Sequence, residues 1–378
     1  SDVYKRQGLL NPNGDEVVPT TVLEMTEAEQ SFRFDGLSAK PVASILRGFS
    51  APVVLARETS AEEQRFLLAH DTDAFNRWEA SRDLARACLF AMVTEGAGPD
   101  TAWIDALEQV IRDGELDPAF RALMLALPTQ SELAQMLHAK GVTPDPDAIH
   151  AAAETLRDAM AERWSSLLPE LMAANRVTDA YSPDAEQSGK RALGNAVLSL
   201  QTRLDGGKAA QAQFDAADNM TMQLSALSCL ISAGAEEAAL AAFEQQWKDD
   251  RLVMDKWFAL QVAATKPENA APRAEALTKR PDFDWKNPNR FRAVMGSLAM
   301  NHAGFHAKDG SGYRLLAEWL IKLDGKNPQT AARMCSVFQT WKRYDEGRQA
   351  LMKAELERIA AKPDLSRDVS EMVGRLLS

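Results

Sequence analysis

At 378 residues, 46% of them hydrophobic, the chain exceeds one ordinary domain, so we expect two domains or one elongated helical array. Its net charge of −11 would repel the phosphates of a nucleic acid, and no basic cluster offsets that repulsion. No apolar run approaches the roughly 18 residues needed to span a bilayer, so we expect a cytoplasmic protein without membrane or nucleic-acid partners.

The N-terminal segment is expected to be β-structure. The opening SDVYKRQ fits neither a signal peptide nor the strand pattern that follows, so we interpret residues 1–7 as a fragment end or a foreign scar. From residue 8 to 56, short alternating or β-branched runs are separated by turn residues. The predicted strands lie at 17–18, 21–25, 31–34, 45–46 and 53–55. Three to five strands cannot bury both faces of a β-sandwich, so we expect open strand edges.

At Thr59 the hydrophobic period changes from about two to about 3.6, which predicts amphipathic helices from there to the C-terminus. Ser60 and the acidic residues after it are typical of a helix start. Further helices are predicted at approximately 73–96, 100–113, 117–127, 130–139, 146–174, 183–204, 207–217, 220–233, 236–248, 252–264, 269–279, 288–301, 311–324, 328–341, 345–362 and 366–377. The loops are short, so successive helices should pack as antiparallel hairpins. Residues 57–378 are therefore predicted to form an irregular α-superhelix of the HEAT or armadillo kind, without a fixed-period repeat.

One stretch of the second half carries the most information. Residues 287–316 read NPNRFRAVMGSLAMNHAGFHAKDGSGYRLL, with an Asn-Pro helix start, an arginine one turn later, a helix break and a Gly-Ser-Gly restart. Its companions are DNMTMQLSAL (218–227), VMDKWFALQ (253–261), NPQTAAR (327–333) and KRYDEGRQ (342–349). Together they resemble the C-terminal part of the bacterial aminopeptidases N, which belong to the M1 family of zinc-dependent peptidases. The resemblance covers nearly the whole chain from about Gly8 onward.

The resemblance implies a mainly α fold in which part of an Ig-like β-sandwich, residues 8–56, precedes the α-superhelix, residues 57–378. It implies that this region forms the lid and access chamber of an enzyme that removes N-terminal amino acids from short peptides. The implied partners are the missing N-terminal and catalytic domains of the same chain and peptide substrates, in a monomer. The resemblance also implies zinc in the intact enzyme. This sequence itself lacks HExxH and the Gly-x-Met-Glu-Asn loop. We therefore expect no catalytic residue, no metal site and no activity in this stretch alone.

His302 and His306 form the sharpest metal-site candidate, because two histidines at i and i+4 share one helix face and have the zinc-peptidase spacing. Ala303 stands where the general-base glutamate would be needed, Gly304 interrupts the helix, and no third ligand follows. We therefore favour loop histidines that cap helix ends or bind the backbone. The three cysteines have no histidine near them in sequence and are expected to be buried free thiols.

Arg292 and Arg333 are the candidate site residues. Each follows an Asn-Pro helix start, at Asn287 and Asn327, and lies off the apolar stripe of its helix. From the residues alone, solvated surface charge is an equally good interpretation. In the family that the chain resembles, arginines at these positions line the inner cavity near the primed end of the substrate. The resemblance therefore implies a substrate-channel role, in which a guanidinium binds a peptide carboxylate or carbonyl at two points.

The alternative interpretation is a stand-alone helical solenoid scaffold that binds another protein along its concave face. The two hypotheses differ upstream, because a peptidase reading frame would contain HExxH and a following glutamate. Under either hypothesis Trp257, Trp319 and Trp341, which recur at helical spacing, are expected in the core.

Overall fold

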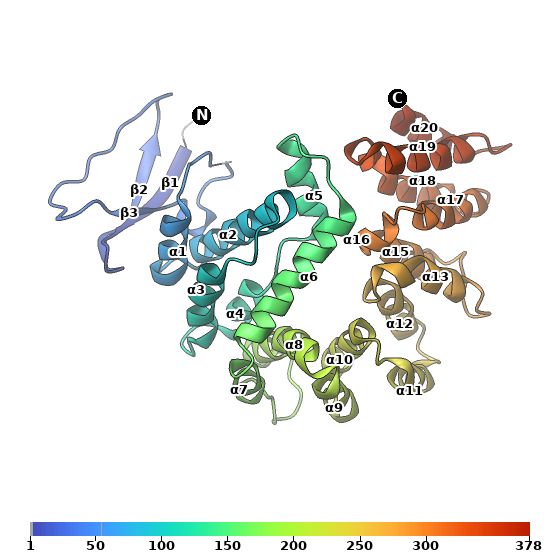
Figure 1. The fold of residues 1–378 in the computed structure, drawn as a ribbon, viewed down its shortest axis with the longest axis horizontal. Helices are drawn as coiled ribbons and strands as arrows, with labels where there is room; N and C mark the ends of the chain where they lie inside the picture. The colour runs from blue at the N-terminus through green and yellow to red at the C-terminus, as the bar shows by residue number, and fades with distance from the viewer. Residues whose placement is uncertain (1–2, 54) are drawn as a thin grey trace. The chain divides into compact units, whose positions relative to one another are not determined.

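The computed structural model describes residues 3–53 and 55–378, in which a small sheet precedes a long series of helices (Figure 1). The helical elements are η1 (Arg47–Phe49), α1 (Ala61–His70), α2 (Ala74–Glu95), α3 (Thr101–Arg112), α4 (Pro118–Met124), α5 (Gln130–Ala139), α6 (Pro146–Arg163), α7 (Leu167–Ala174), α8 (Ala185–Asp205), α9 (Lys208–Ala216), α10 (Met220–Ala233), α11 (Glu237–Trp247), α12 (Arg251–Ala263), α13 (Pro267–Thr278), α14 (Pro288–Phe291), η2 (Arg292–Gly296), α15 (Ser297–Met300), α16 (His302–Phe305), α17 (Ser311–Asp324), α18 (Pro328–Cys335), η3 (Ser336–Arg343), α19 (Glu346–Ala360) and α20 (Arg367–Leu377). Among these helices, none combines the length and apolarity that crossing a membrane requires.

The chain folds into two compact units. The N-terminal unit contains the residues up to Pro128 together with Ala159–Val197. The C-terminal unit contains Thr129–Asp158 together with Leu198–Ser378. Both candidate arginines and both candidate histidines belong to the C-terminal unit.

Strand β1 (Val3–Leu10) is the centre of the sheet and pairs antiparallel with β2 (Glu16–Met25) on one side and β3 (Val42–Ile45) on the other. In the turn between β1 and β2, the Asn11 side chain accepts two backbone hydrogen bonds. Gly14 follows with a φ of +90°, a conformation that a side chain would disfavour. Strands β2 and β3 are therefore the two edges of this sheet (Figure 1).

Two details differ from the predicted strands. Residues 3–7, which the sequence pattern set apart, form the first part of β1 and pair with the end of β2, because backbone hydrogen bonding requires no hydrophobic alternation. The strand predicted at 31–34 is wrong: that segment is irregular, since β1 already has a neighbour on each side. The strand predicted at 53–55 includes Val54, which lies outside the described residues.

Arg47 links the sheet to the first helices of the N-terminal unit. Its side chain is 5% exposed and binds carboxylates at Glu16 (2.9 Å) and Asp71 (3.1 Å) and the hydroxyl of Ser44 (2.8 Å). Burial raises the pKa of Asp71, an effect that the hydrogen bonds and the Arg47 charge oppose. The partners of the buried Arg47 guanidinium thus come from β2, from β3 and from the end of α1, and these contacts hold the three elements together.

Local polar side chains set the helix starts. Both predicted Asn-Pro starts are confirmed: Asn287 accepts a hydrogen bond from the N–H of Asn289, and Asn327 from that of Thr330. In each case proline occupies the first helical position, where its missing N–H costs nothing.

Three predicted helices are interrupted. The helix predicted at 146–174 divides into α6 and α7, because Pro169 has no N–H to continue the hydrogen-bond ladder and is tolerated only in a first turn. The helix predicted at 288–301 contains a π-helical turn, η2, and that predicted at 328–341 continues as the 3₁₀ helix η3. Arg292 opens the π-helical turn.

Aromatic side chains build the core of the C-terminal unit. Trp257 and Trp319 are 4% and 7% exposed, and Phe258 and Phe283 lie between them with successive ring centroids 5.2, 6.3 and 5.2 Å apart. Trp341 is 9% exposed and its indole N–H donates to a backbone carbonyl of α20. The prediction that these tryptophans are core residues is confirmed.

Candidate functional site

Arg292 lies on the surface of the C-terminal unit. Its guanidinium donates to the carbonyl of Pro288 (3.1 Å) and to the side-chain oxygen of Asn289 (2.8 Å), both in the preceding turn. No ion pair joins Arg292 to any carboxylate among the described residues. The charge is therefore exposed and uncompensated, and the hydrogen bonds hold the side chain against α14.

Arg333 is also exposed, on α18. Its carbonyl accepts a hydrogen bond from the hydroxyl of Ser336 (2.7 Å), whereas its guanidinium makes no hydrogen bond or ion pair with another described residue. The Arg333 guanidinium is thus free of partners, whereas that of Arg292 already uses Nε and Nη2 within its own turn. Both groups are exposed, a property that suits carboxylate binding and equally suits solvation. Their substrate-channel role stays a prediction.

His302 and His306 lie in a buried cluster with two tyrosines. His302 is 9% exposed and its Nε2 is 3.1 Å from the Tyr344 hydroxyl, while His306 is 5% exposed and its Nδ1 is 2.7 Å from the Tyr313 hydroxyl. The two imidazole rings are 4.8 Å apart between centroids. The expectation that they cap helix ends or bind the backbone is wrong, because α16 brings both rings inward onto tyrosines.

Gly304 packs inside α16 and does not break it. The break occurs at Asn301, whose side-chain amide donates to the carbonyls of Val262 (3.1 Å) and Thr265 (2.9 Å). A Cβ atom on Gly304 would lie 2.6 Å from the Cβ of Ala270 in α13. The glycine therefore permits the close contact between α16 and α13.

This histidine cluster does not fit a metal ion. Burial lowers the pKa of His302 to about 4 and that of His306 well below its usual value, and the Arg348 charge lowers both further. One nitrogen of each ring contacts a tyrosine hydroxyl, and Arg348 donates to the carbonyl of His306, so a cation and not an anionic ligand lies beside the pair. Within the described residues, no three histidine, cysteine, aspartate or glutamate side chains are placed to hold a metal ion.

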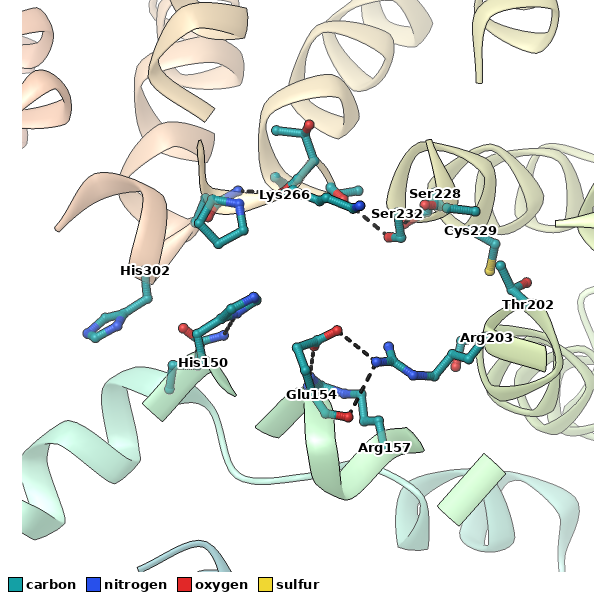
Figure 2. A pocket seen from close by; sticks show the side chains of 18 of the residues that line it. His150, Glu154, Arg157, Thr202, Arg203, Ser228, Cys229, Ser232, Lys266 and His302 are labelled. Atoms are coloured by element: carbon teal, nitrogen blue, oxygen red, sulfur yellow. Dashed lines mark hydrogen bonds and ion pairs between the residues drawn. The ribbon is translucent and has the colours of Figure 1, made fainter. Parts of the chain in front are cut away.

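A pocket of about 790 Å³ opens within the C-terminal unit (Figure 2). We call it the α6–α13 pocket, because α6 forms one wall and the start of α13 forms part of the other. Figure 2 shows His150 and Glu154 of α6 on one side and Ser232 and Lys266 facing them on the other. The ring of His302 is turned away from the centre of the pocket.

The α6 wall of the pocket carries a network of ion pairs, which Arg203 of α8 completes. Arg203 binds Asp158 (2.6 Å) and Glu154 (2.9 Å), and Arg157 binds the other oxygen of Glu154 (2.7 Å) (Figure 2). Burial alone would raise the pKa of Glu154, but the Arg203 hydrogen bond and charge outweigh it, so the pKa is lowered. Two carboxylates and two guanidinium groups therefore neutralise one another on this wall.

The opposite wall keeps its charges unpaired. Lys266 is the N-cap residue of α13 and makes no capping hydrogen bond through its side chain, which is exposed. Glu268, two residues later, is exposed as well. Neither has an ion-pair partner among the residues that the structure describes. Met300 adds an apolar side chain that is 77% exposed.

The pocket has room for a ligand, but its one cysteine has no base beside it in the described structure. Cys229 lines the pocket, yet burial raises the pKa of its thiol and no histidine contacts it in the described structure. The sequence pattern did not identify this pocket, since its residues come from segments between Gln130 and His302. The one local signal was Lys266-Pro267, a helix start without the usual polar cap.

Two protein families match the chain. Residues 61–378 match a family described as "Domain of unknown function (DUF3458_C) ARM repeats". Residues 6–58 match one described as "Domain of unknown function (DUF3458) Ig-like fold". The predicted fold class, an armadillo-like helical array preceded by part of an Ig-like β-sandwich, is confirmed.

Curated relatives and a solved structure resemble the chain over its whole length. It is 39% identical to an aminopeptidase N of Caulobacter vibrioides over 98% of this chain and 43% of that protein. It is 34% identical to the aminopeptidase N of Escherichia coli over 100% of this chain and 44% of that protein. The crystal structure of Legionella pneumophila aminopeptidase A in complex with aspartic acid superposes with a TM-score of 0.86 at 29% identity, over 100% of this chain and 45% of that one. The chain thus spans less than half the length of these relatives.

Proposed function

Since the chain belongs to the ARM-repeat family that covers residues 61–378 and corresponds to the C-terminal part of its aminopeptidase N relatives, we propose that it is the non-catalytic region of a zinc-dependent aminopeptidase. The intact enzyme removes N-terminal amino acids from short peptides. Residues 8–56 complete a β-sandwich with an earlier part of the same polypeptide, and residues 57–378 form the lid and access chamber.

The observation that carries this proposal is the extent of the match. Relatives named aminopeptidase N align with 98–100% of this chain, yet they are more than twice as long. The described residues of this chain do not fit a zinc site, so zinc and the hydrolytic step are assigned to the remainder of the enzyme. What this region contributes is binding, access and exclusion of water.

Arg292 and Arg333 are proposed to hold the C-terminal side of the peptide. Their guanidinium groups are exposed and bind no carboxylate of the described chain, so a substrate carboxylate would meet an uncompensated charge. A guanidinium offers two parallel N–H donors to a carboxylate, which fixes orientation as well as affinity.

The test begins upstream of the chain. We expect the reading frame that precedes Ser1 to encode HExxH and a following glutamate. The chain of 378 residues, produced alone, should cleave neither a dipeptide nor an alanine anilide, and the product of the longer frame should cleave both. An upstream frame without HExxH, or tight one-to-one zinc retained by the isolated chain through a chelator wash, would favour the scaffold alternative.

A further inference from the structure

The exposed apolar surface of the chain is concentrated near the sheet. Of the ten large hydrophobic side chains that are exposed in the described part of the chain, five lie between positions 17 and 55. Single apolar residues scattered over a surface are ordinary, whereas a cluster of them marks an interaction site. The N-terminal unit therefore has a surface that the described residues leave uncovered.

Phe49 is the most exposed of these five residues, at 59%. Its φ of +51° is left-handed, a conformation that a bulky side chain disfavours. Hydrogen bonds on both sides of Phe49 fix this turn. The N–H of Gly48 donates to the carboxylate of Asp73 (2.9 Å), and the N–H of Arg6 donates to the hydroxyl of Ser50 (2.9 Å). The chain thus holds a phenyl ring in water at a conformational cost, which is a reason to look for a function.

The Phe49 ring begins a row of aromatic side chains that continues on α2. Its centroid lies 5.3 Å from that of Phe75, which lies 6.0 Å from that of Trp78. Phe75 and Trp78 are half-buried and three residues apart, so they share one face of the helix. We call Phe49, Phe75 and Trp78 the aromatic row. Aromatic side chains of this kind are enriched at the centre of protein interfaces.

The aromatic row lies close to the point where the chain enters the sheet. Arg6 contacts Ser50, the residue after Phe49, and only three residues of β1 separate Arg6 from Val3. At about 3.3 Å per residue, Val3 lies roughly 10 Å along the strand from this contact. Polypeptide that leads into β1 could therefore reach the row within a few residues.

The relatives supply an occupant of sufficient size. They align with 98–100% of this chain and are more than twice as long, and the proposed function assigns the additional length to the part before Ser1. The proposed β-sandwich contact uses the sheet that Arg6 belongs to, so a contact on the row would continue the same interface. Burial of Phe49 there would offset the cost of its left-handed backbone.

We propose that the aromatic row is a docking surface for the part of the polypeptide that precedes Ser1 in the intact enzyme, with Phe49 packed against an apolar surface of that part. This inference rests on the proposed function. It adds a contact made by the turn η1 and by α2 to the contact already assigned to the sheet. The row thereby connects the first helices of the superhelix to the rest of the enzyme.

The experiment is hydroxyl-radical footprinting read by mass spectrometry. It compares the 378-residue chain alone with the product of the longer reading frame. Oxidation of Phe49 and Trp78 should be about ten-fold slower in the longer protein, because the centre of an interface excludes water. Tyr181 is an exposed aromatic residue of the same unit outside the row, and its oxidation rate should be the same in both proteins.

A substitution tests whether Phe49 organises the contact. In Phe49→Asn the ring is lost, and asparagine tolerates a left-handed backbone, so the isolated chain should keep its midpoint of urea unfolding. In the longer protein the protection of Trp78 should fall below about two-fold, since water then reaches the row. The matched control is Leu123→Asn, which removes an exposed apolar side chain of α4 in the same unit and should leave the protection of Trp78 intact.

Three outcomes would overturn the proposal. The first is an equal oxidation rate of Phe49 in the two proteins, or a loss of rate that Tyr181 shares. The second is protection of Trp78 that survives Phe49→Asn. The third is protection of the row in the isolated chain that increases with its concentration, which would show that a second copy covers it. Any of these results in a longer protein that contains HExxH and cleaves peptides would refute this inference alone, whereas a longer frame without HExxH would refute the proposed function.

Discussion

At the scale of single residues, His302 and His306 show how a familiar spacing can serve a structural role. Their rings contact Tyr344 and Tyr313, and Arg348 donates to the carbonyl of His306 (2.7 Å) while binding Asp147 (2.9 Å). In the folded chain both imidazoles are neutral because burial lowers their pKa values. The cluster therefore packs α16 against its neighbours. Its lowered pKa values also make the free energy of unfolding depend on pH.

The sign of that dependence follows from the pKa of His302. In the unfolded chain an imidazole titrates near 6.5, whereas burial lowers the pKa of folded His302 to about 4. Below pH 6.5 the unfolded state therefore binds more protons than the folded state. The stabilisation is fully present above pH 6.5 and is lost as the pH falls toward 4.

We predict that His302 alone reduces the free energy of unfolding by roughly 3 kcal/mol between pH 6.5 and pH 4. His302→Phe should remove this contribution and leave that of the buried His306, so the dependence becomes shallower. Tyr344 then loses the contact with His302 at every pH. Urea unfolding followed by tryptophan fluorescence at several pH values measures the slope. His138→Phe, which replaces an exposed histidine, should retain the parent slope. A His302→Phe variant with the parent slope would contradict the neutral state of His302.

The sequence could identify these histidines but not their partners. Tyr344 lies 42 residues beyond His302, and no local pattern announces a contact across that separation. The argument against a metal site came from Ala303, which stands where the motif requires a glutamate. For Arg292 and Arg333, the pattern predicted a position off the apolar stripe, and both are exposed.

At the scale of helices and strands, the sequence predicted helix starts from local signals but could not predict which strands pair. Asn287-Pro and Asn327-Pro start helices because the capping atoms and the fixed proline geometry are within three residues. The segment 31–34 alternates like a strand, yet a strand also needs a free neighbour, which no local pattern reveals. Pro169 did carry a readable break signal, which the hydrophobic period of 146–174 obscured.

The contact between α16 and α13 gives a prediction for Gly304. In Gly304→Ala the new methyl group would lie 2.6 Å from the Cβ of Ala270 and 2.9 Å from the carbonyl of Pro267, so one helix must move. We expect a loss of about 1–3 kcal/mol in the free energy of unfolding. Gly325→Ala is the matched control, because that position has helical φ and open space, and its stability should be unchanged or slightly increased. Equal midpoints of urea unfolding for both variants would show that the close contact is not formed.

The edge strands of the sheet give a second prediction at this scale. Strands β2 and β3 each have one unpaired edge, and Val17 and Val22 of β2 are 43% and 55% exposed. We expect a nonspecific protease to cut first within residues 8–55, because unpaired edges open at low free energy. Mass spectrometry of the early fragments locates the cuts, and first cleavage within residues 73–377 would contradict the expectation.

At the scale of the whole molecule, the evidence for a function is the match to aminopeptidase N relatives and not any single residue. The chain aligns with them from end to end while spanning less than half their length. The pocket residues, in contrast, come from segments far apart in the sequence, so composition and spacing could not bring them together. The proposed function therefore depends on whether the exposed charges of the C-terminal unit bind a peptide in a longer enzyme.

The most direct measurement compares two substrates in the intact enzyme. In Arg292→Ala and Arg333→Ala, a charge-assisted contact worth roughly 1–3 kcal/mol should be lost for a tripeptide, which lowers kcat/KM about five- to hundred-fold. An amino-acid anilide has no peptide carboxylate, so its kcat/KM should change much less, and Arg375→Ala, at an exposed position on α20, should change neither. A selective loss for the tripeptide is the result that the substrate-channel role predicts. Equal, small changes for both substrates would contradict it and leave Arg292 and Arg333 as solvated surface charges.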